Sequence, residues 1–150
     1  MKALKETAYE QIIALLDEKI TMAEKAVLSA KESRNSETKS SAGDKHETGR
    51  AMSQIELDNS EMQLGKVLNL KRQFLQLDVL KERNIVEPGC LVRTDNGTYF
   101  ISIGLGKIEL KNADCYAVSI QSPIGRAMQN KKVGDLISFQ NKHFEVQDIL

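Results

Sequence analysis

A heptad pattern of apolar residues near the start of the chain constrains the fold more than any other feature. Steps of four and three residues alternate without a break, which places one apolar stripe along a helix. Neither Gly nor Pro occurs between residues 3 and 34. The pattern therefore predicts a long amphipathic helix, roughly 48 Å in length at 1.5 Å per residue. The stripe consists of Tyr9, Ile13, Leu16, Ile20, Ala23, Val27 and Ala30.

A second, looser heptad pattern predicts another helix, from near Asp44 to near Arg83. Between residues 31 and 50 the chain is polar, and Ala42 is its only aliphatic side chain, so this stretch cannot contribute to a core. Two amphipathic helices joined by a short polar turn bury their stripes against each other. We expect an antiparallel coiled-coil hairpin over residues 1–83, with an acidic and polar tip near residues 35–50. The second stripe consists of Met52, Ile55, Met62, Val67, Leu70, Phe74 and Leu77.

The sequence texture changes after Asn84, which predicts a second domain over residues 84–150. Pro88 and Gly89 are followed by short runs of β-forming residues, and Asp95-Asn96-Gly97 is a strong hairpin turn. The fold class is therefore α+β, with a long antiparallel coiled-coil hairpin followed by a small domain built on an antiparallel sheet. The expected strands are 90–94, 98–103, 107–110, 116–120, 136–139 and 143–149, with a short helix over 122–130.

Composition excludes several classes of function. Basic and acidic residues number 21 each, so no net charge attracts a phosphate backbone, and direct binding to nucleic acid is not expected. No apolar run approaches the roughly 20 residues that span a bilayer, and residues 1–10 lack a signal-peptide core, so we expect a cytoplasmic protein that does not bind membranes. Cys90 and Cys115 lie far apart and read as buried small residues. Nucleotide-loop, hydrolase-elbow and zinc-protease motifs are missing, so no active site of its own is expected.

Two acidic residues near the hairpin tip are the strongest candidates for chemistry. Asp44 and Glu47 stand three residues apart where the second helix is expected to start, which puts both on one helix face. Two such carboxylates can share a Mg²⁺ ion with another macromolecule. The same spacing suits a capping box that satisfies backbone amides, and the two interpretations are compatible. His46 is read as a solvated loop residue, and the hydroxyl-rich stretch 36–41 as a flexible loop.

A third pattern occupies the second domain. Residues 122–127 read Ser-Pro-Ile-Gly-Arg-Ala, and residues 131–135 read Lys-Lys-Val-Gly-Asp. Locally, this predicts a strand, a helix start with Pro at its first position, a short helix and a turn. The two motifs, in this order and spacing, resemble the C-terminal domain of the Gre family of bacterial transcription elongation factors. That family also places an antiparallel coiled coil before an FKBP-like domain, so the resemblance spans almost the whole chain.

The resemblance implies a mode of action. In the family, the hairpin enters the secondary channel of RNA polymerase and brings two acids to the active-site Mg²⁺, and the polymerase then cleaves backtracked RNA. The tip motif of those factors maps onto Gly43, Asp44 and Glu47, which implies that these two acids act in trans on a metal shared with the polymerase. No cofactor of the chain's own is implied, and RNA or DNA is met only through the polymerase. Thr48-Gly49-Arg50-Ala51 departs from the family's Asn-Ala-Glu-Tyr.

The same resemblance assigns contacts in the second domain and leaves a choice of outcome. The family's C-terminal domain holds the polymerase at the rim of the channel, which makes Ser122, Pro123 and Ile124 contact candidates, whereas locally they serve as helix start and core. The leading hypothesis is an elongation regulator that stimulates transcript cleavage. The alternatives are a regulator that occupies the channel without cleavage, and a self-associating adaptor whose heptad stripes pair between chains.

Overall fold

The structure is a computed structural model that describes the backbone of residues 1–39 and 43–150, and the side chains of residues 1–36 and 47–150. The chain forms two compact units, which are described separately. One unit comprises residues 14–72, and the other comprises residues 1–13 together with 73–150. The division at residue 83 that the sequence suggests follows the change in secondary structure, and it stays a prediction.

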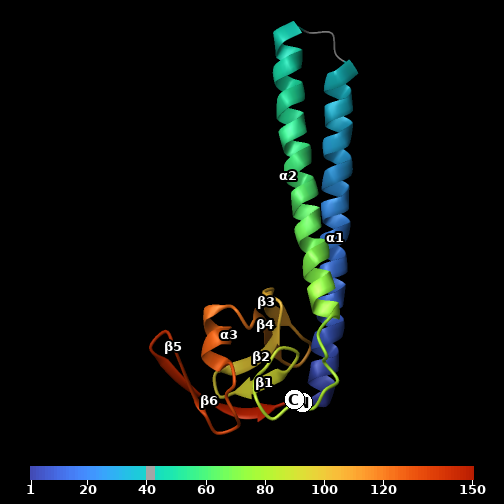
Figure 1. The fold of residues 1–150 in the computed structure, drawn as a ribbon. Helices are drawn as coiled ribbons and strands as arrows, with labels where there is room; N and C mark the ends of the chain where they lie inside the picture. Colours follow the sequence, from blue (N-terminus) through green and yellow to red (C-terminus); the bar gives the residue numbers. More distant parts are fainter. Residues whose placement is uncertain (40–42) are drawn as a thin grey trace. The chain divides into compact units, whose positions relative to one another are not determined.

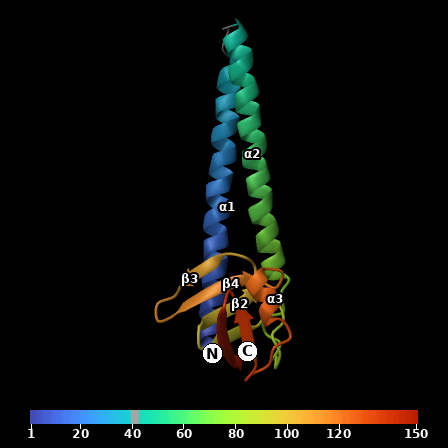
Figure 2. The ribbon, with the colours of Figure 1, turned by 90° about the vertical axis from the view of Figure 1, so that its left-hand side faces the viewer.

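Two long helices make up the first unit and continue into the second. Helix α1 spans Lys2–Lys39 and helix α2 spans Gly43–Leu75. They run side by side in opposite directions, as both ribbon views show (Figures 1 and 2). Lys71 of α2 donates to the carboxylate of Asp17 on α1 at 2.6 Å. The predicted antiparallel hairpin is confirmed, and α1 extends to Lys39, five residues beyond the range 3–34 on which the helix was predicted.

Every residue of the predicted α1 stripe is buried or half-buried, whereas the first three residues of the α2 stripe are exposed. Val27 and Ala30 form a buried cluster with Leu57, against which Leu64 packs. In contrast, Met52, Ile55 and Met62 are 67%, 60% and 52% exposed, so their assignment to the helix interface was wrong. The physical reason is register. Val67 and Phe74 stand one heptad apart, and alternating steps of three and four residues back from Val67 lead to residues 64, 60, 57 and 53. The helix interface therefore includes Ser53 and Ser60 in place of larger side chains.

Helix α2 ends earlier than the sequence suggested, at Leu75 and not near Arg83. Beyond it, the Asp78 carboxylate accepts hydrogen bonds from the backbone N–H groups of Leu80 and Lys81, at 3.3 and 3.1 Å, which favours a turn over a helix. The Arg83 guanidinium donates to the carbonyl oxygens of Asp78 and Lys81. Its Nε also lies 2.9 Å from the Glu87 carboxylate. These bonds hold the segment after α2 in one irregular conformation.

A six-stranded sheet forms the centre of the second unit, with strand order β3-β4-β2-β1-β6-β5. The observed elements agree with the predicted ones to within a few residues. They are β1 (Leu91–Thr94), β2 (Gly97–Ser102), β3 (Gly106–Glu109), β4 (Asp114–Ser119), α3 (Pro123–Met128), β5 (Leu136–Phe139) and β6 (Lys142–Ile149).

The fold class is confirmed as α+β, but the sheet is mixed where we expected an antiparallel one. Strand β4 pairs with β2 in parallel, with Thr98 opposite Cys115 and Ser102 opposite Ser119. The chain reverses direction twice between these strands, once before and once after β3, and β4 then lies between β2 and β3. Two reversals return the chain to its original direction, so the pairing of β2 with β4 has to be parallel.

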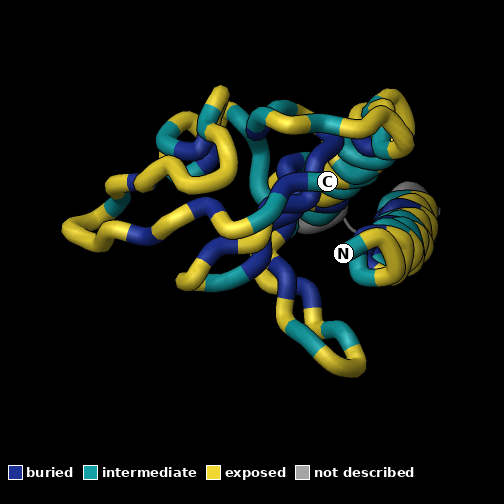
Figure 3. The backbone as a smooth tube through the Cα atoms, turned by 90° about the horizontal axis from the view of Figure 1, so that it is seen from below, coloured by how far each residue is buried: buried dark blue, intermediate teal, exposed yellow. Residues whose placement is uncertain are grey.

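The core of this unit lies between the sheet and α3. Ile101, Met128, Ile137, Phe144 and Val146 are among its buried members, and Ile124 packs against it from α3. Buried and exposed residues alternate from His143 to Gln147 of β6, whereas four successive residues of β2, Thr98 to Ile101, are buried. The tube coloured by burial shows buried segments at the centre of this domain (Figure 3). Cys90 and Cys115 are both buried free thiols, as predicted. Burial raises the pKa of Cys115 to about 11 and also raises the pKa of Cys90.

Candidate functional site

The hairpin tip holds the acid pair that the sequence singles out. Residues 44 and 47 lie in the first two turns of α2, which begins at Gly43. Glu47 is exposed. The side chains of Asp44, His46 and residues 37–41 lie outside the described residues, and Ser36 is exposed. The backbone of residues 36–39 belongs to α1 and that of residue 46 to α2, so the prediction of a loop at these positions was wrong. The choice between metal sharing and helix capping therefore stays a prediction. Among the side chains that the structure describes, no group of three or more His, Cys, Asp or Glu could hold a metal ion.

The start of α3 holds the three predicted contact residues. Ser122 is the N-cap of this helix: its Oγ accepts a hydrogen bond from the Gly125 N–H at 3.1 Å and donates to the Ser119 carbonyl at 2.6 Å. Pro123 occupies the first helical position, where no backbone donor is needed. The local interpretation of Ser122 and Pro123 as a helix start is thus confirmed.

The same three residues differ in what they offer to a partner. Pro123 is exposed, Ser122 is half-buried, and Ile124 is half-buried because it packs against the core. Arg126 is exposed one turn beyond Pro123 and adds a charge to the same short helix. Sequence reasoning noted Arg126 as part of the motif but did not select it. Its exposure, which the sequence pattern does not reveal, makes it a fourth contact candidate.

The second motif, residues 131–135, fixes the start of β5. The Asp135 carboxylate accepts from the Lys132 backbone N–H at 2.8 Å, and Gly134, at φ 92°, donates to the Val146 carbonyl at 2.8 Å. The Val86 N–H donates to the Lys131 carbonyl at 2.9 Å. The motif therefore ties the segment before the sheet, the turn and the last strand together.

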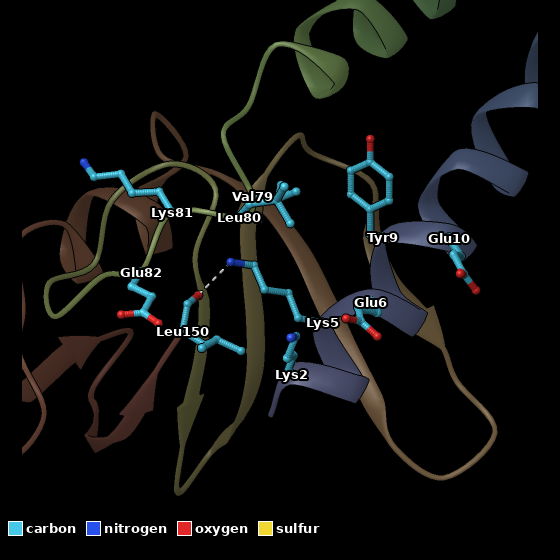
Figure 4. A pocket seen from close by; sticks show the side chains of 10 residues that line it. All are labelled: Lys2, Lys5, Glu6, Tyr9, Glu10, Val79, Leu80, Lys81, Glu82 and Leu150. Carbon is cyan, nitrogen blue, oxygen red and sulfur yellow. Dashed lines mark hydrogen bonds between the residues drawn. The ribbon is translucent and has the colours of Figure 1, made fainter.

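A pocket of about 480 Å³ lies within the second unit, beside the first turns of α1. Lys5 crosses it and donates from Nζ to the Leu150 carbonyl at 3.0 Å (Figure 4). Burial, followed by the nearby charge of Arg83, lowers the pKa of Lys5. The lining residues include three lysines and three glutamates, whose formal charges cancel. The sequence did not point to this pocket, whose lining residues are Lys2, Lys5, Glu6, Tyr9, Glu10, Val79, Leu80, Lys81, Glu82 and Leu150.

The structure thus combines a helical hairpin with a mixed-sheet α+β domain that presents a capped Ser-Pro helix. No protein-family model and no curated protein matches the chain. Among solved structures, it is similar to GreA factor homolog 1 (Gfh1) of Thermus thermophilus, with a TM-score of 0.39 and 16% identity over 95% of this chain and 94% of that one. A second structure of the transcription factor Gfh1 gives a TM-score of 0.35 and 16% identity over 95% and 93%. Similarity at this level does not establish membership of a family.

One further property concerns membranes. No helix in the described part of the chain is both long enough and apolar enough to cross a lipid bilayer.

Proposed function

We propose that this chain regulates transcription elongation by binding RNA polymerase in the bacterial cytoplasm, with the hairpin tip inserted into the secondary channel. The polymerase is the enzyme, and the chain acts on it without an active site of its own. The observation that carries the proposal is the placement of the two motifs that resemble the Gre signature. Residues 122–127 form the capped start of α3, and residues 131–135 form the turn before β5, in the order that the signature requires.

The hairpin supports the proposal through its dimensions. Helix α1 has 38 residues, which at 1.5 Å per residue gives a rod of about 57 Å. Small side chains at the helix interface, Ala30 and Ser53 among them, let the two helices approach closely. A slender two-helix rod with a polar end suits insertion into a narrow channel.

The tip supplies the chemistry of the proposal. Asp44 and Glu47 would add two carboxylates to a Mg²⁺ ion held by the polymerase, and a second metal there activates water for in-line attack on the phosphodiester. Carboxylates are the ligands that Mg²⁺ prefers, so the residue types fit the ion. Their spacing of three residues in α2 also fits, because helical positions three apart are neighbours.

The direct test uses RNA polymerase halted in a backtracked complex. The purified chain is added, and both co-migration with the complex and shortening of the RNA are measured. We expect both, and we expect Asp44→Ala with Glu47→Ala to abolish shortening while co-migration persists. Unchanged shortening in the double variant would refute the acid-pair mechanism. Co-migration without shortening in the wild type would indicate a regulator that only occupies the channel.

A second candidate function, a self-associating adaptor, is favoured by one observation. Met22, Met52, Ile55 and Met62 expose more than half of their surface on the hairpin, and exposed apolar side chains on helices mark contact surfaces when they lie close together. Sedimentation at micromolar concentration separates the two functions. A monomer supports the polymerase regulator. A dimer that Met52→Gln with Ile55→Gln dissociates would support the adaptor.

A further inference from the structure

Strand β5 lies at one edge of the six-stranded sheet. It pairs with β6 on one side, and within the described residues no strand pairs with it on the other side. Figure 1 shows this strand at the edge of the domain. An unpaired edge presents backbone N–H and C=O groups to its surroundings, and it can pair with an extended segment of another chain.

The register of the hairpin decides which backbone groups face outward. Gln140 and Asn141 form a two-residue turn with φ values of 49° and 62°, and Phe139 is opposite Lys142. In such a turn the closing pair is hydrogen-bonded, and hydrogen-bonded and open pairs then alternate. Ile137 and Phe139 therefore bond to β6, whereas the N–H and C=O groups of Leu136 and Ser138 point away from the sheet.

A contact farther along the hairpin agrees with this alternation. Two residues before Ile137, the Asp135 carbonyl accepts from the Val146 N–H at 3.0 Å. The bonded positions are thus 135, 137 and 139, and the outward ones are 136 and 138. In the part of the chain that the structure describes, the backbone groups of Leu136 and Ser138 make no hydrogen bond to a turn, a loop or a side chain.

The two edges of the sheet differ in their side chains. At the opposite edge, β3 carries Lys107, which forms an ion pair with Asp114 at 3.0 Å, and Glu109. Charges of this kind protect an edge against pairing. Strand β5 instead exposes Leu136, at 62%, and the turn before it exposes Val133, at 57%. An added strand would cover part of this apolar surface.

Charge near β5 indicates the kind of segment that fits. The segment counted runs from Pro123, where α3 begins, to Glu145, which is opposite Leu136 in β6. It contains four basic side chains and two acidic ones: Arg126, Lys131, Lys132 and Lys142 against Asp135 and Glu145. The Asp135 carboxylate is already bonded to a backbone N–H. The excess of positive charge favours an acidic segment and disfavours pairing with β5 of a second copy.

We infer that the outer edge of β5 binds an extended, acidic segment of a partner protein as an additional strand. The Leu136 and Ser138 backbone groups would provide the ladder hydrogen bonds, and Leu136 would provide an apolar contact for alternate side chains of the segment. This surface is separate from the hairpin tip, and the inference does not depend on binding to RNA polymerase.

The test uses an eight-residue peptide of alternating valine and glutamate, added to the whole chain labelled with ¹⁵N. We expect the amide signals of Leu136 and Ser138 to shift and to exchange at least tenfold more slowly, while those of Ile137 and Phe139 change little. A peptide with lysine in place of glutamate should bind about tenfold more weakly at low salt. Absence of shifts at Leu136 and Ser138 at millimolar peptide would overturn the inference, as would shifts confined to β3.

A matched pair of variants isolates the backbone donor. Ser138→Pro removes the outward N–H without removing a bond to β6, and Pro is tolerated where an edge-strand N–H faces solvent. Ser138→Ala keeps the N–H and removes the hydroxyl that contacts His143 Nδ1 at 2.9 Å. We expect at least a tenfold loss of peptide affinity for the first variant and none for the second. If Ser138→Pro perturbs the β6 signals, a peptide N-methylated on alternate residues replaces it, and equal binding of that peptide overturns the inference.

The same spectra also reveal self-pairing. Shifts at Leu136 and Ser138 that depend on protein concentration without peptide would identify a second copy as the occupant, and would overturn the assignment to a partner segment.

Discussion

Gly125 lies so close to Ser119 that a Cβ atom on Gly125 would stand 2.0 Å from the Ser119 carbonyl oxygen. That oxygen also accepts a hydrogen bond from the Ser122 hydroxyl. The end of β4 and the first turn of α3 therefore meet backbone to backbone, and only glycine fits between them. The contact explains physically why the motif at residues 122–127 contains a glycine inside a helix, where glycine otherwise costs stability.

Replacing this glycine should destabilise the fold. We expect Gly125→Ala to lower the free energy of unfolding by several kcal/mol, because backbone atoms of β4 and α3 have to move apart. Gly65 is the matched control: it lies within α2, and apart from its chain neighbours and the backbone of its own helix no atom is within 4 Å of an added Cβ. Gly65→Ala should stabilise by up to about 1 kcal/mol. Urea unfolding measures the free energy of unfolding of both variants. A change of the same sign in Gly125→Ala and Gly65→Ala would contradict the close contact between β4 and α3.

The corrected register of α2 makes a second prediction. Leu57 is 2% exposed and Met52 is 67% exposed, although both are large apolar residues on the same helix. Leu57→Ala should cost about 2–4 kcal/mol of stability, whereas Met52→Ala should cost less than about 1 kcal/mol. Thermal unfolding followed by helical circular dichroism compares them. A larger loss of stability for Met52→Ala than for Leu57→Ala would indicate that Met52 lies in the helix interface, as the sequence pattern suggested.

The buried thiol of Cys115 makes stability depend on alkaline pH. Its pKa in the folded chain is about 11, above the ordinary value of 9.0, because burial disfavours the thiolate. A raised folded pKa contributes stability below pH 9, and this contribution is lost as pH rises to 11, by roughly 2–3 kcal/mol. In Cys115→Ala the decline between pH 9 and 11 should be shallower by that amount. Cys90 and Lys5 are present in both the wild type and Cys115→Ala, so their contributions to the pH dependence cancel in the comparison. Parallel curves of unfolding free energy against pH for the two proteins would contradict the prediction.

The start of α3 allows structural and contact roles to be separated. Ser122→Ala removes the side-chain cap and should cost about 1 kcal/mol of stability. Pro123 is exposed, so Pro123→Ala should change stability by less than about 0.5 kcal/mol and should weaken binding to RNA polymerase if this helix contacts it. Denaturation and a polymerase binding titration measure the two effects. Full binding by the Pro123 variant would remove it from the contact surface.

The hairpin could be predicted from sequence because its signal is periodic and local. The α1 stripe at Val27 and Ala30 is buried as its spacing indicates. The distal α2 stripe could not be read in the same way, since Met52 and Ile55 form a stripe that competes with the one through Ser53 and Leu57. The stripe through Met52 and Ile55 is the more hydrophobic of the two, whereas the stripe through Ser53 and Leu57 is continuous with Val67 and Phe74. Only the packing of α2 against α1 shows that the second of these is buried.

The sheet shows a similar limit. Individual strands follow from runs of β-forming residues between glycines, and their bounds were predicted closely. Strand order is a property of contacts between distant residues, so the parallel pairing of Tyr99 with Tyr116 left no local signal. The candidate site divides in the same way: the cap at Ser122 was readable from sequence, whereas the exposure of Arg126 and the pocket beside Lys5 depend on the assembled fold.

The proposed function requires that the hairpin tip reach the active-site region of RNA polymerase. The most direct measurement is site-specific photo-crosslinking from Thr48, an exposed tip residue, with a crosslinker at the exposed Leu28 of α1 as control. We expect position 48 to crosslink to polymerase residues around the catalytic Mg²⁺, and position 28 to crosslink elsewhere along the channel. Crosslinks from position 48 confined to the outer surface of the polymerase, or to a second copy of this chain, would contradict the proposed function.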